Sequence, residues 1–362
     1  MKRGALSVLQ TVRNTVLILA LCAIGLPASG AFSPPRNLDP GAATIRLDSS
    51  FQSDAWLVYT YDIDESGSVV NATIQSSNGV PEVEQAVLSQ VKAMRFQPAM
   101  SNGRPVKVSA DPVIYTWILD KERELSPGFD EMYRRAWALF SENNYEAASG
   151  IAVELQSYPG RNAREEVKAQ VLAASVASRQ QDEAAELRHL SRIVELQNLA
   201  LNNNFKNTYV PEDQYLKMLD RIVSLQLDAM MLADAGATLQ QLQALGQGSE
   251  VATAAGNRYR QAQQAFSSMS ELTVMGELLP LFPDGPGSWE TGLSRSDFSI
   301  SDVHGRIGAV YLVCSSGERQ LRYPSSGVWQ IPPGWTDCKI DVAGQAGTRF
   351  VLHQLAQGSA RP

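Results

Sequence analysis

The 362-residue chain has little of the chemistry that enzymes and metal sites use. It contains only three histidines and three cysteines, and neither residue type is clustered along the sequence. No glycine-rich phosphate loop precedes an expected helix, so a nucleotide site of that kind is not indicated. We therefore expect no catalytic residue, no metal ligand and no small-molecule cofactor.

Charge is also scarce. Charged residues make up 19% of the sequence, and the formal net charge is −7. A nucleic-acid-binding protein needs a basic surface to neutralise phosphates, so we expect no nucleic-acid partner. With 44% hydrophobic residues, the chain is long enough for two or three domains with cores of their own.

Long apolar runs are nearly absent, apart from Thr15 to Leu26. This run follows Lys2, Arg3 and Arg13, and small residues come soon after it. At about twelve residues it is short for a helix that spans a ~30 Å bilayer core. The pattern is typical of a secretory signal peptide that is cleaved near residues 30–31. Retention as an inner-membrane anchor is the alternative.

Cleavage would remove Cys22 and leave Cys314 and Cys338. An even pair of cysteines in an exported protein predicts a disulfide between them. A lipid attached to Cys22 is the less favoured alternative, because Leu21 stands where lipoprotein signals have a small residue.

Composition changes near residues 121–128 and again near 280–292, which divides the chain. The fold class is therefore α+β, with an α+β domain, an all-α domain and a small all-β sandwich or barrel. The expected segments are a signal peptide at 1–30, a linker at 31–53, and domains at 54–120, 126–280 and 293–356, with a linker at 281–292.

The first domain reads as two strands, a helix and a final strand. Residues 56–63 and 68–75 have strong β propensity on either side of a glycine turn, and residues 82–94 repeat apolar positions at helical spacing. Residues 104–119 return as extended chain. The buried face of the helix is expected to consist of Val83, Val87, Leu88 and Val91.

Short motifs in this domain follow one another in a recognisable order. A turn at Asp64 to Gly67 joins the two strands, and Ser77-Asn78-Gly79 ends the second. Arg95-Phe96-Gln97-Pro98-Ala99 and then Gly103-Arg104-Pro105-Val106 follow the helix. In order and spacing these motifs resemble the C-terminal domain of TonB, over about a sixth of the chain.

The resemblance implies a binding site. In that family the last strand receives an extended segment of an outer-membrane transporter, and unpaired backbone groups at a sheet edge make such pairing favourable. The candidate binding residues are Val113, Ile114, Tyr115, Thr116 and Trp117. The matching family-motif residues are Arg95, Phe96, Pro98, Gly103 and Pro105. In the alternative interpretation, Tyr115 and Trp117 are core residues that only stabilise the sheet.

The chain also departs from the family. TonB has an uncleaved anchor with a functional histidine and a long proline-rich spacer, whereas the first histidine here is His189 and the connector is short. Most of this chain follows the domain instead of preceding it. These departures place energy transduction from an inner-membrane motor in doubt.

The middle of the chain contains two similar segments, at 133–159 and 167–196. The first contains Asn-Tyr-Glu-Ala-Ala and the second contains the similar Gln-Asp-Glu-Ala-Ala. Both segments resemble tetratricopeptide-type helical hairpins. Asn143 and Gln180 replace the usual turn glycine. A third pair is expected at 215–245 and a closing helix at 250–279. Such hairpins offer a concave face to partners; a plain helical spacer is the alternative.

The last region has short apolar strands separated by Gly and Pro turns. Trp329 and Trp335 flank a Pro-Pro-Gly turn and form either a ligand platform or part of a small core. Two local pairs suggest enzyme chemistry only by spacing: Ser89 with Lys92, and Glu186 with His189. Neither has the supporting motifs that its chemistry requires.

We therefore expect an exported periplasmic or envelope adaptor that binds an extended segment of another envelope or outer-membrane protein, related to TonB-dependent transport. The chain would associate with a membrane by binding that partner or by means of an uncleaved N-terminal segment. The alternative is a structural component of an envelope assembly without a transport role. A hydrolase in the last module is a third and weaker hypothesis.

Overall fold

The computed structural model describes residues 32–33, 35–38, 54–101, 103–110, 113–117, 124–202, 208–280, 287–324 and 327–356. The expected signal peptide and most of the expected linker 31–53 lie outside these residues. The chain divides into two compact units. One comprises Met1–Ser126, Ser157–Glu166 and Leu199–Asn207, and the other comprises the remaining helices and the C-terminal strands.

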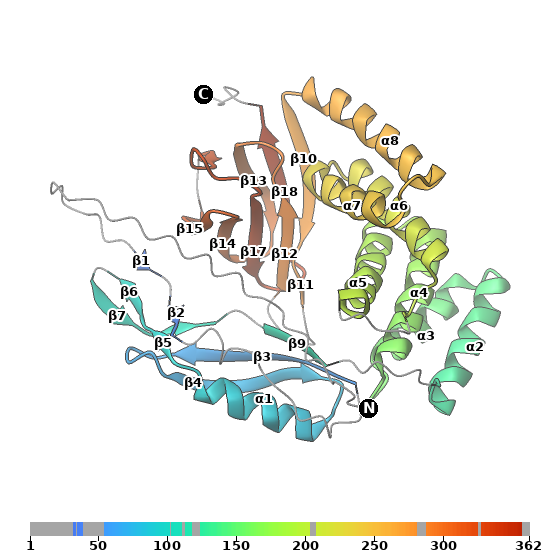
Figure 1. Cartoon of the computed structure of the whole chain (residues 1–362), viewed down its shortest axis with the longest axis horizontal. Coiled ribbons are helices and arrows are strands. Elements are labelled where there is room, and N and C mark those ends of the chain that lie inside the picture. Colours follow the sequence, from blue (N-terminus) through green and yellow to red (C-terminus); the bar gives the residue numbers. More distant parts are fainter. Residues whose placement is uncertain are drawn as a thin grey trace. The chain divides into compact units, whose positions relative to one another are not determined.

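Strand β3 (Ala55–Ile63) is the central strand of the first unit. Strand β4 (Val69–Ser77) pairs with one side of it. Strands β9 (Val113–Trp117) and β8 (Val108–Ser109) pair with the other side, each over part of its length. Helix α1 (Pro81–Ala93) packs against β4, as Figure 1 shows. The expected order of strand, strand, helix and strand is confirmed.

The periodicity of β3 and α1 explains this packing. Leu57, Tyr59 and Ile63 alternate along β3 and are buried together with Val83 and Val87 of α1. Alternation places every second strand residue on one face, and three- and four-residue spacing does the same on a helix. The shorter strands of this unit are β1 (Phe32–Ser33), β2 (Arg36–Asn37), β5 (Phe96–Gln97), β6 (Ala99–Ser101) and β7 (Arg104–Val106).

Seven helices follow in the described residues. They are α2 (Pro127–Ser141), α3 (Tyr145–Gln156), α4 (Ala163–Gln180), α5 (Glu183–Asn202), α6 (Glu212–Asp228), α7 (Leu232–Leu245) and α8 (Glu250–Ser267). Helices α2 and α3 pack together, and α6, α7 and α8 pack with one another. An all-α region therefore follows the first domain, as expected from the sequence.

The turns of three helical hairpins share one backbone geometry. The residues Asn143, Gln181 and Met230 have φ values of 61°, 59° and 58°. The N–H of the next residue in each turn donates to a carbonyl of the preceding helix: Asn144 to Leu139, Asp182 to Ala177 and Met231 to Gln226. These are the bonds of a Schellman motif, in which a left-handed residue ends a helix.

This geometry corrects one detail and leaves one prediction open. The residue in the glycine-like position of the second turn is Gln181, whereas the sequence indicated Gln180. The third turn follows the second at a longer interval than the second follows the first. The chain therefore lacks one constant repeat length, and the tetratricopeptide resemblance stays a prediction.

The C-terminal strands form two antiparallel sheets. The first has the order β10 (Glu271–Glu277), β18 (Arg349–Leu355), β13 (Asp297–His304), β16 (Trp329–Gln330). The second has the order β11 (Leu279–Pro280), β12 (Gly287–Gly292), β17 (Lys339–Gly344), β14 (Ile307–Cys314), β15 (Gly317–Leu321). Phe298, Leu312 and Phe350 are fully buried in their common core. Over the described residues this is an open sandwich and not a closed barrel.

One expected element is wrong. The closing helix predicted for 250–279 ends at Ser267, and Glu271–Glu277 forms strand β10 instead. Leu272, Val274 and Gly276 alternate inward along β10, which is the period of a strand. A Cβ at Gly276 would lie 2.4 Å from the Phe350 ring, so the strand packs closely on the core.

Helix α7 is joined to β12 by a buried carboxylate. Asp234 accepts hydrogen bonds from the hydroxyl of Thr291 and from the backbone N–H of Gly292. Burial raises the pKa of Asp234, because the charged form loses hydration. The helices and the C-terminal sandwich therefore share a contact within the second unit.

The described residues lack two features, a helix suited to cross a membrane and a metal-binding cluster. No helix among them combines the length and apolar character that a membrane crossing requires. Likewise, no group of histidine, cysteine or acidic side chains in these ranges is arranged to hold a metal ion.

The turn geometry generates the first prediction. Gln181→Gly should raise the free energy of unfolding by about 0.5–1 kcal/mol, because glycine adopts a positive φ without the strain of a Cβ. Gln180→Gly is the matched control. Residue 180 ends helix α4, so glycine there should lower the free energy of unfolding by about 0.5–1 kcal/mol. Urea denaturation measures both, and equal losses would contradict the left-handed assignment.

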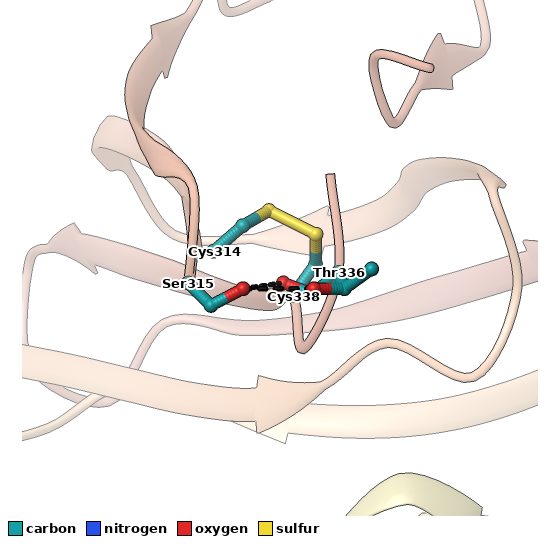
Figure 2. Close-up of a disulfide and its surroundings, with 4 residues drawn as sticks. All are labelled: Cys314, Ser315, Thr336 and Cys338. Atoms are coloured by element: carbon teal, nitrogen blue, oxygen red, sulfur yellow. Dashed lines mark hydrogen bonds between the residues drawn. A yellow bond between two sulfur atoms is a disulfide. The ribbon is translucent and has the colours of Figure 1, made fainter. Parts of the chain in front are cut away.

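The predicted disulfide is present. Cys314 at the end of β14 is bonded to Cys338 just before β17, at a sequence separation of 24 residues. Figure 2 shows that Ser315 also bonds Thr336 beside it, with its hydroxyl donating to the Thr336 carbonyl at 2.9 Å. The bridge thus joins two segments that the backbone already holds together.

The disulfide generates the second prediction. Replacing both cysteines by alanine should lower the free energy of unfolding by roughly 3 kcal/mol, because the unfolded chain regains the freedom of the closed loop. Chemical denaturation of the native and double-variant proteins measures the difference. Mass spectrometry should find no free thiol in the mature native protein, and two free thiols would contradict the assignment.

Candidate partner-binding strand

All five predicted binding residues lie in strand β9. Trp117 stands opposite Ala55 in the β3 ladder, Thr116 opposite Trp56, and Tyr115 opposite Leu57. Residues 118–119, which the sequence analysis included in this strand, lie outside the described residues. Within the described ranges β9 pairs only with β3, so its other side is an edge of the sheet.

Two hydrogen bonds fix which backbone groups face that edge. The N–H of Asn78 donates to the carbonyl of Trp56 at 3.1 Å, so the backbone groups of Trp56 point toward β4. The N–H of Ala110 donates to the carbonyl of Tyr61 at 2.8 Å, so Tyr61 points to the opposite side. Backbone groups alternate in direction along a strand, so Leu57, like Tyr61, directs its N–H and C=O groups to the side on which β9 lies.

The alternation carries over to β9. Tyr115 stands opposite Leu57 and shares its hydrogen-bonding side, so the backbone of Tyr115 is directed inward. Its neighbours Ile114 and Thr116 therefore direct their N–H and C=O groups to the open edge. The sequence left this parity undecided, and the ladder geometry resolves it.

The side chains of β9 have a separate role. Tyr115 and Trp117 are 8% and 1% exposed and belong to the core of the first unit. Burial raises the pKa of the Tyr115 phenol and that of the neighbouring Tyr59. The alternative interpretation of these two side chains as core residues is therefore correct, and it leaves the backbone edge open.

Neither of these side chains is held by a polar contact. The Tyr115 hydroxyl and the Trp117 ring N–H are buried without a hydrogen-bond partner among the described residues. A buried unpaired polar atom lowers stability, so burial of the rings and the ladder to β3 must hold β9 in place.

The start of β3 is anchored on the other face of the sheet. Asn78 is buried, accepts a hydrogen bond from the N–H of Trp56 at 3.1 Å, and donates one to the carbonyl of Asp54 at 3.0 Å. The guanidinium of Arg161 lies 5.3 Å from the centre of the Trp56 ring and is itself paired with Glu166. The pairing partner of β9 is thus fixed at the end where Trp56 faces Thr116.

The family-motif residues build turns. Phe96 is buried in the core, and the Arg95 guanidinium donates to the Met94 carbonyl at 2.8 Å at the end of α1. Gly103 has a φ of 75° in the turn between β6 and β7. Pro98 is half-buried and Pro105 is exposed. The structure thus gives these residues positions in the core and in the turns of the first unit.

Of the two residue pairs that suggested enzyme chemistry, one forms contacts between helices and the other is exposed. The carboxylate of Glu186 accepts two hydrogen bonds from Arg221, at 2.8 and 2.6 Å, and His189 bonds Gln170 at 2.7 Å. These are contacts between neighbouring helices. Ser89 and Lys92 lie exposed on α1.

The structure brings together one polar cluster that no local sequence pattern indicated. The Ser301 hydroxyl lies 2.6 Å from His353 Nε2, and Glu271 bonds the other ring nitrogen of His353. Three strands of one sheet bring these residues together, so no local motif identifies them. The Ser301 hydroxyl also lies 2.8 Å from the Asp302 carboxylate. A negative group there opposes a developing oxyanion, which favours a structural role.

The geometry of the first unit agrees with its comparison to known families. Residues 56–119 match the family described as the Gram-negative bacterial TonB protein C-terminal domain. No curated protein matches the chain. This is a family of non-enzymatic protein-interaction domains and indicates an envelope protein related to TonB-type function. The match thus assigns residues 56–119, and not the whole chain, to the TonB C-terminal domain family.

Proposed function

We propose that this chain is an exported periplasmic adaptor whose strand β9 captures an extended segment of another envelope or outer-membrane protein. The observation that carries the proposal is the outward direction of the backbone groups of Ile114 and Thr116 at the sheet edge. An incoming strand pairs with such groups by β-augmentation.

The free energy available at the β9 edge limits how long a partner stays bound. Two outward residues supply two donors and two acceptors, and each net hydrogen bond contributes about 1 kcal/mol. A total of about 4 kcal/mol corresponds to a Kd of about 1 mM. The edge by itself therefore supports brief capture, and a stable complex needs further contacts elsewhere on the chain.

The proposed location rests on the N-terminal segment and on the cysteines. Export with cleavage near residues 30–31 places the mature protein in an oxidising compartment, where the Cys314–Cys338 bond persists. The TonB family is an envelope family, which agrees with this location. An uncleaved segment that anchors the chain in the inner membrane is the alternative.

A second candidate function uses the helices. A groove of about 540 Å³ is lined by residues of α2, α4, α5 and α6, among them Phe140, Arg179 and Met218. In this alternative the helices hold an envelope assembly together and the β9 edge is not used. The two functions differ in which part of the chain a partner requires.

The edge proposal predicts the effect of one proline. Thr116→Pro should abolish capture of the partner while the protein stays folded, because it removes an outward N–H and obstructs the incoming strand. Thr116→Ala keeps that N–H and should retain the partner. Tyr115→Pro removes an inward N–H and should destabilise the sheet. The measurement is affinity capture from solubilised envelopes with the mature protein, with circular dichroism as the folding control.

The outcome separates the two functions. Loss of a partner in Thr116→Pro that Thr116→Ala keeps supports the edge. Should the folded Thr116→Pro variant retain every partner, strand capture at β9 is wrong and the helical groove becomes the better site. Charge reversal at Arg179, which is exposed in that groove, then tests the alternative.

A further inference from the structure

Strand β10 ends the four-stranded sheet of the C-terminal sandwich. Within the described ranges it pairs only with β18, along all seven of its residues. The other strands that end a sheet of this sandwich, β11, β15 and β16, are shorter. An edge strand presents a row of unpaired N–H and C=O groups on its outer side, so β10 is the longest such row in the sandwich.

Hydrogen bonds just beyond the two ends of β10 show which of its backbone groups face outward. Before the strand, the N–H of Ala356 donates to the carbonyl of Ser270 at 2.8 Å. After the strand, the N–H of Leu278 donates to the carbonyl of Thr348 at 2.8 Å. Both ends therefore place an even-numbered residue on the hydrogen-bonding side of β18, and the ladder between them has no register shift. Alternation directs the odd-numbered residues of β10 to the other side.

Three residues of β10 thus offer their backbone at the open edge. Thr273, Met275 and Glu277 direct their N–H and C=O groups away from β18, which gives three donors and three acceptors. Their side chains are exposed, whereas those of Leu272 and Val274 lie in the core. The core contacts hold the strand in place while its outer backbone groups remain available for pairing.

Proline, lysine and bulges protect many sheet edges from pairing, and β10 has none of the three. Bulges do occur in the neighbouring ladders of β13 with β18 and of β14 with β17. Met275, at the centre of β10, is 69% exposed and is the most exposed large apolar side chain in the part of the chain that the structure describes. Val351 stands opposite it in β18 and shares its face. An apolar edge without these protections favours pairing with a further strand.

The order of residues in β10 identifies a second copy of the same strand as the occupant. When two copies run antiparallel and are centred on Met275, the two exposed methionines stand opposite each other. Thr273 of one copy then stands opposite Glu277 of the other, and all three outward residues of each copy are paired. The adjacent register would set Glu271 against Glu277 of the other copy, and like charges directly opposite are destabilising. The strand is therefore complementary to itself in one register.

We propose that two copies of this chain form a dimer by antiparallel pairing of their β10 strands about a twofold axis at Met275. The pairing joins two four-stranded sheets into one continuous sheet. It is isologous, so it uses both β10 edges and closes without further extension.

A dimer of this kind carries two copies of strand β9. A partner that supplies two extended segments then gains from a second binding step that is intramolecular. This consequence rests on the proposed capture at β9, whereas the dimer itself does not.

Sedimentation velocity on the mature full-length protein tests the association. One strand pair is smaller than the interface of a lasting dimer, so the dimer should form as the protein concentration rises from about 1 to about 200 µM. Thr273→Pro removes one outward N–H from each copy and should weaken the dimer at least about tenfold. Thr273→Ala keeps that N–H and is the matched control. Circular dichroism verifies that each variant is folded.

A charge at the twofold axis tests the position of the interface. Met275→Lys places two like charges opposite each other and should weaken the dimer at least about tenfold. Met269→Lys adds the same charge at an exposed methionine that precedes the strand, and it should dimerise normally. Thr116→Pro should also dimerise normally, so failure at β10 and failure at β9 are distinguishable.

Cysteine substitutions test the register. Directly opposite residues of a hydrogen-bonded pair have Cα atoms about 5.5 Å apart, which is within the range of a disulfide. Met275→Cys should therefore form a covalent dimer when copper–phenanthroline oxidises the two thiols. Glu277→Cys alone should not, because its two copies stand four positions apart along the strands, or roughly 13 Å. A mixture of Glu277→Cys and Thr273→Cys should form the covalent dimer.

Three outcomes overturn the proposal. The first is a protein that stays monomeric at the highest concentration, which would leave the β10 edge to another polypeptide. The second is a dimer of unchanged affinity in folded Thr273→Pro and folded Met275→Lys. The third is a covalent dimer from Glu277→Cys alone but not from Met275→Cys, which would exclude the centred register.

Discussion

The backbone of strand β3 is hydrogen-bonded on both sides, and this saturation determines which strand is left at the edge. Trp56 points toward β4, and Tyr61 points toward the opposite edge, where β8 and β9 pair with β3. A strand between two neighbours has no free groups to offer, so among the described residues the strands that can receive another chain on that side are the two-residue β8 and the longer β9. Because β9 places Tyr115 and Trp117 in the core, its outer backbone groups are held on a rigid scaffold. Strand β9 therefore has two roles. Its buried side chains stabilise the sheet, and its outer backbone groups remain available for pairing.

A second constraint explains why the motifs of this domain have their spacing. The turn glycine Gly67 has a φ of 83°, and a Cβ there would lie 1.8 Å from the carbonyl oxygen of Phe96. The N–H of Phe96 in turn donates to the Gly67 carbonyl at 2.8 Å. The turn between the first two strands and the segment after the helix therefore touch backbone to backbone. Any side chain at position 67 separates them, which is why a glycine turn and a motif nearly thirty residues later occur together.

What the sequence predicted and what it missed follow from the range of the interactions involved. The strands, helix and turns of the first domain were predicted because alternation, helical spacing and glycine positions are local. The disulfide was predicted because cleavage of the expected signal peptide leaves two cysteines. Strand β10 was missed because Glu271–Glu277 follows a long helix and its alternation is brief. The cluster of Ser301, His353 and Glu271 exists only through strand pairing, and the outward parity of Thr116 requires a known register. Neither is encoded within one segment.

The size of the β9 edge bears on how such a chain could hold a partner. Strand β9 directs two residues outward, so it offers about 4 kcal/mol of net hydrogen bonding, which is too little for a lasting complex alone. Both large aromatics of β9 are buried in the core, so this edge offers backbone groups and not these rings. A partner that also held a second site on the chain would gain from an effective concentration in about the millimolar range, because the second binding step is intramolecular. On this argument β9 adds affinity without strong sequence preference, and a ligand of this edge alone dissociates quickly.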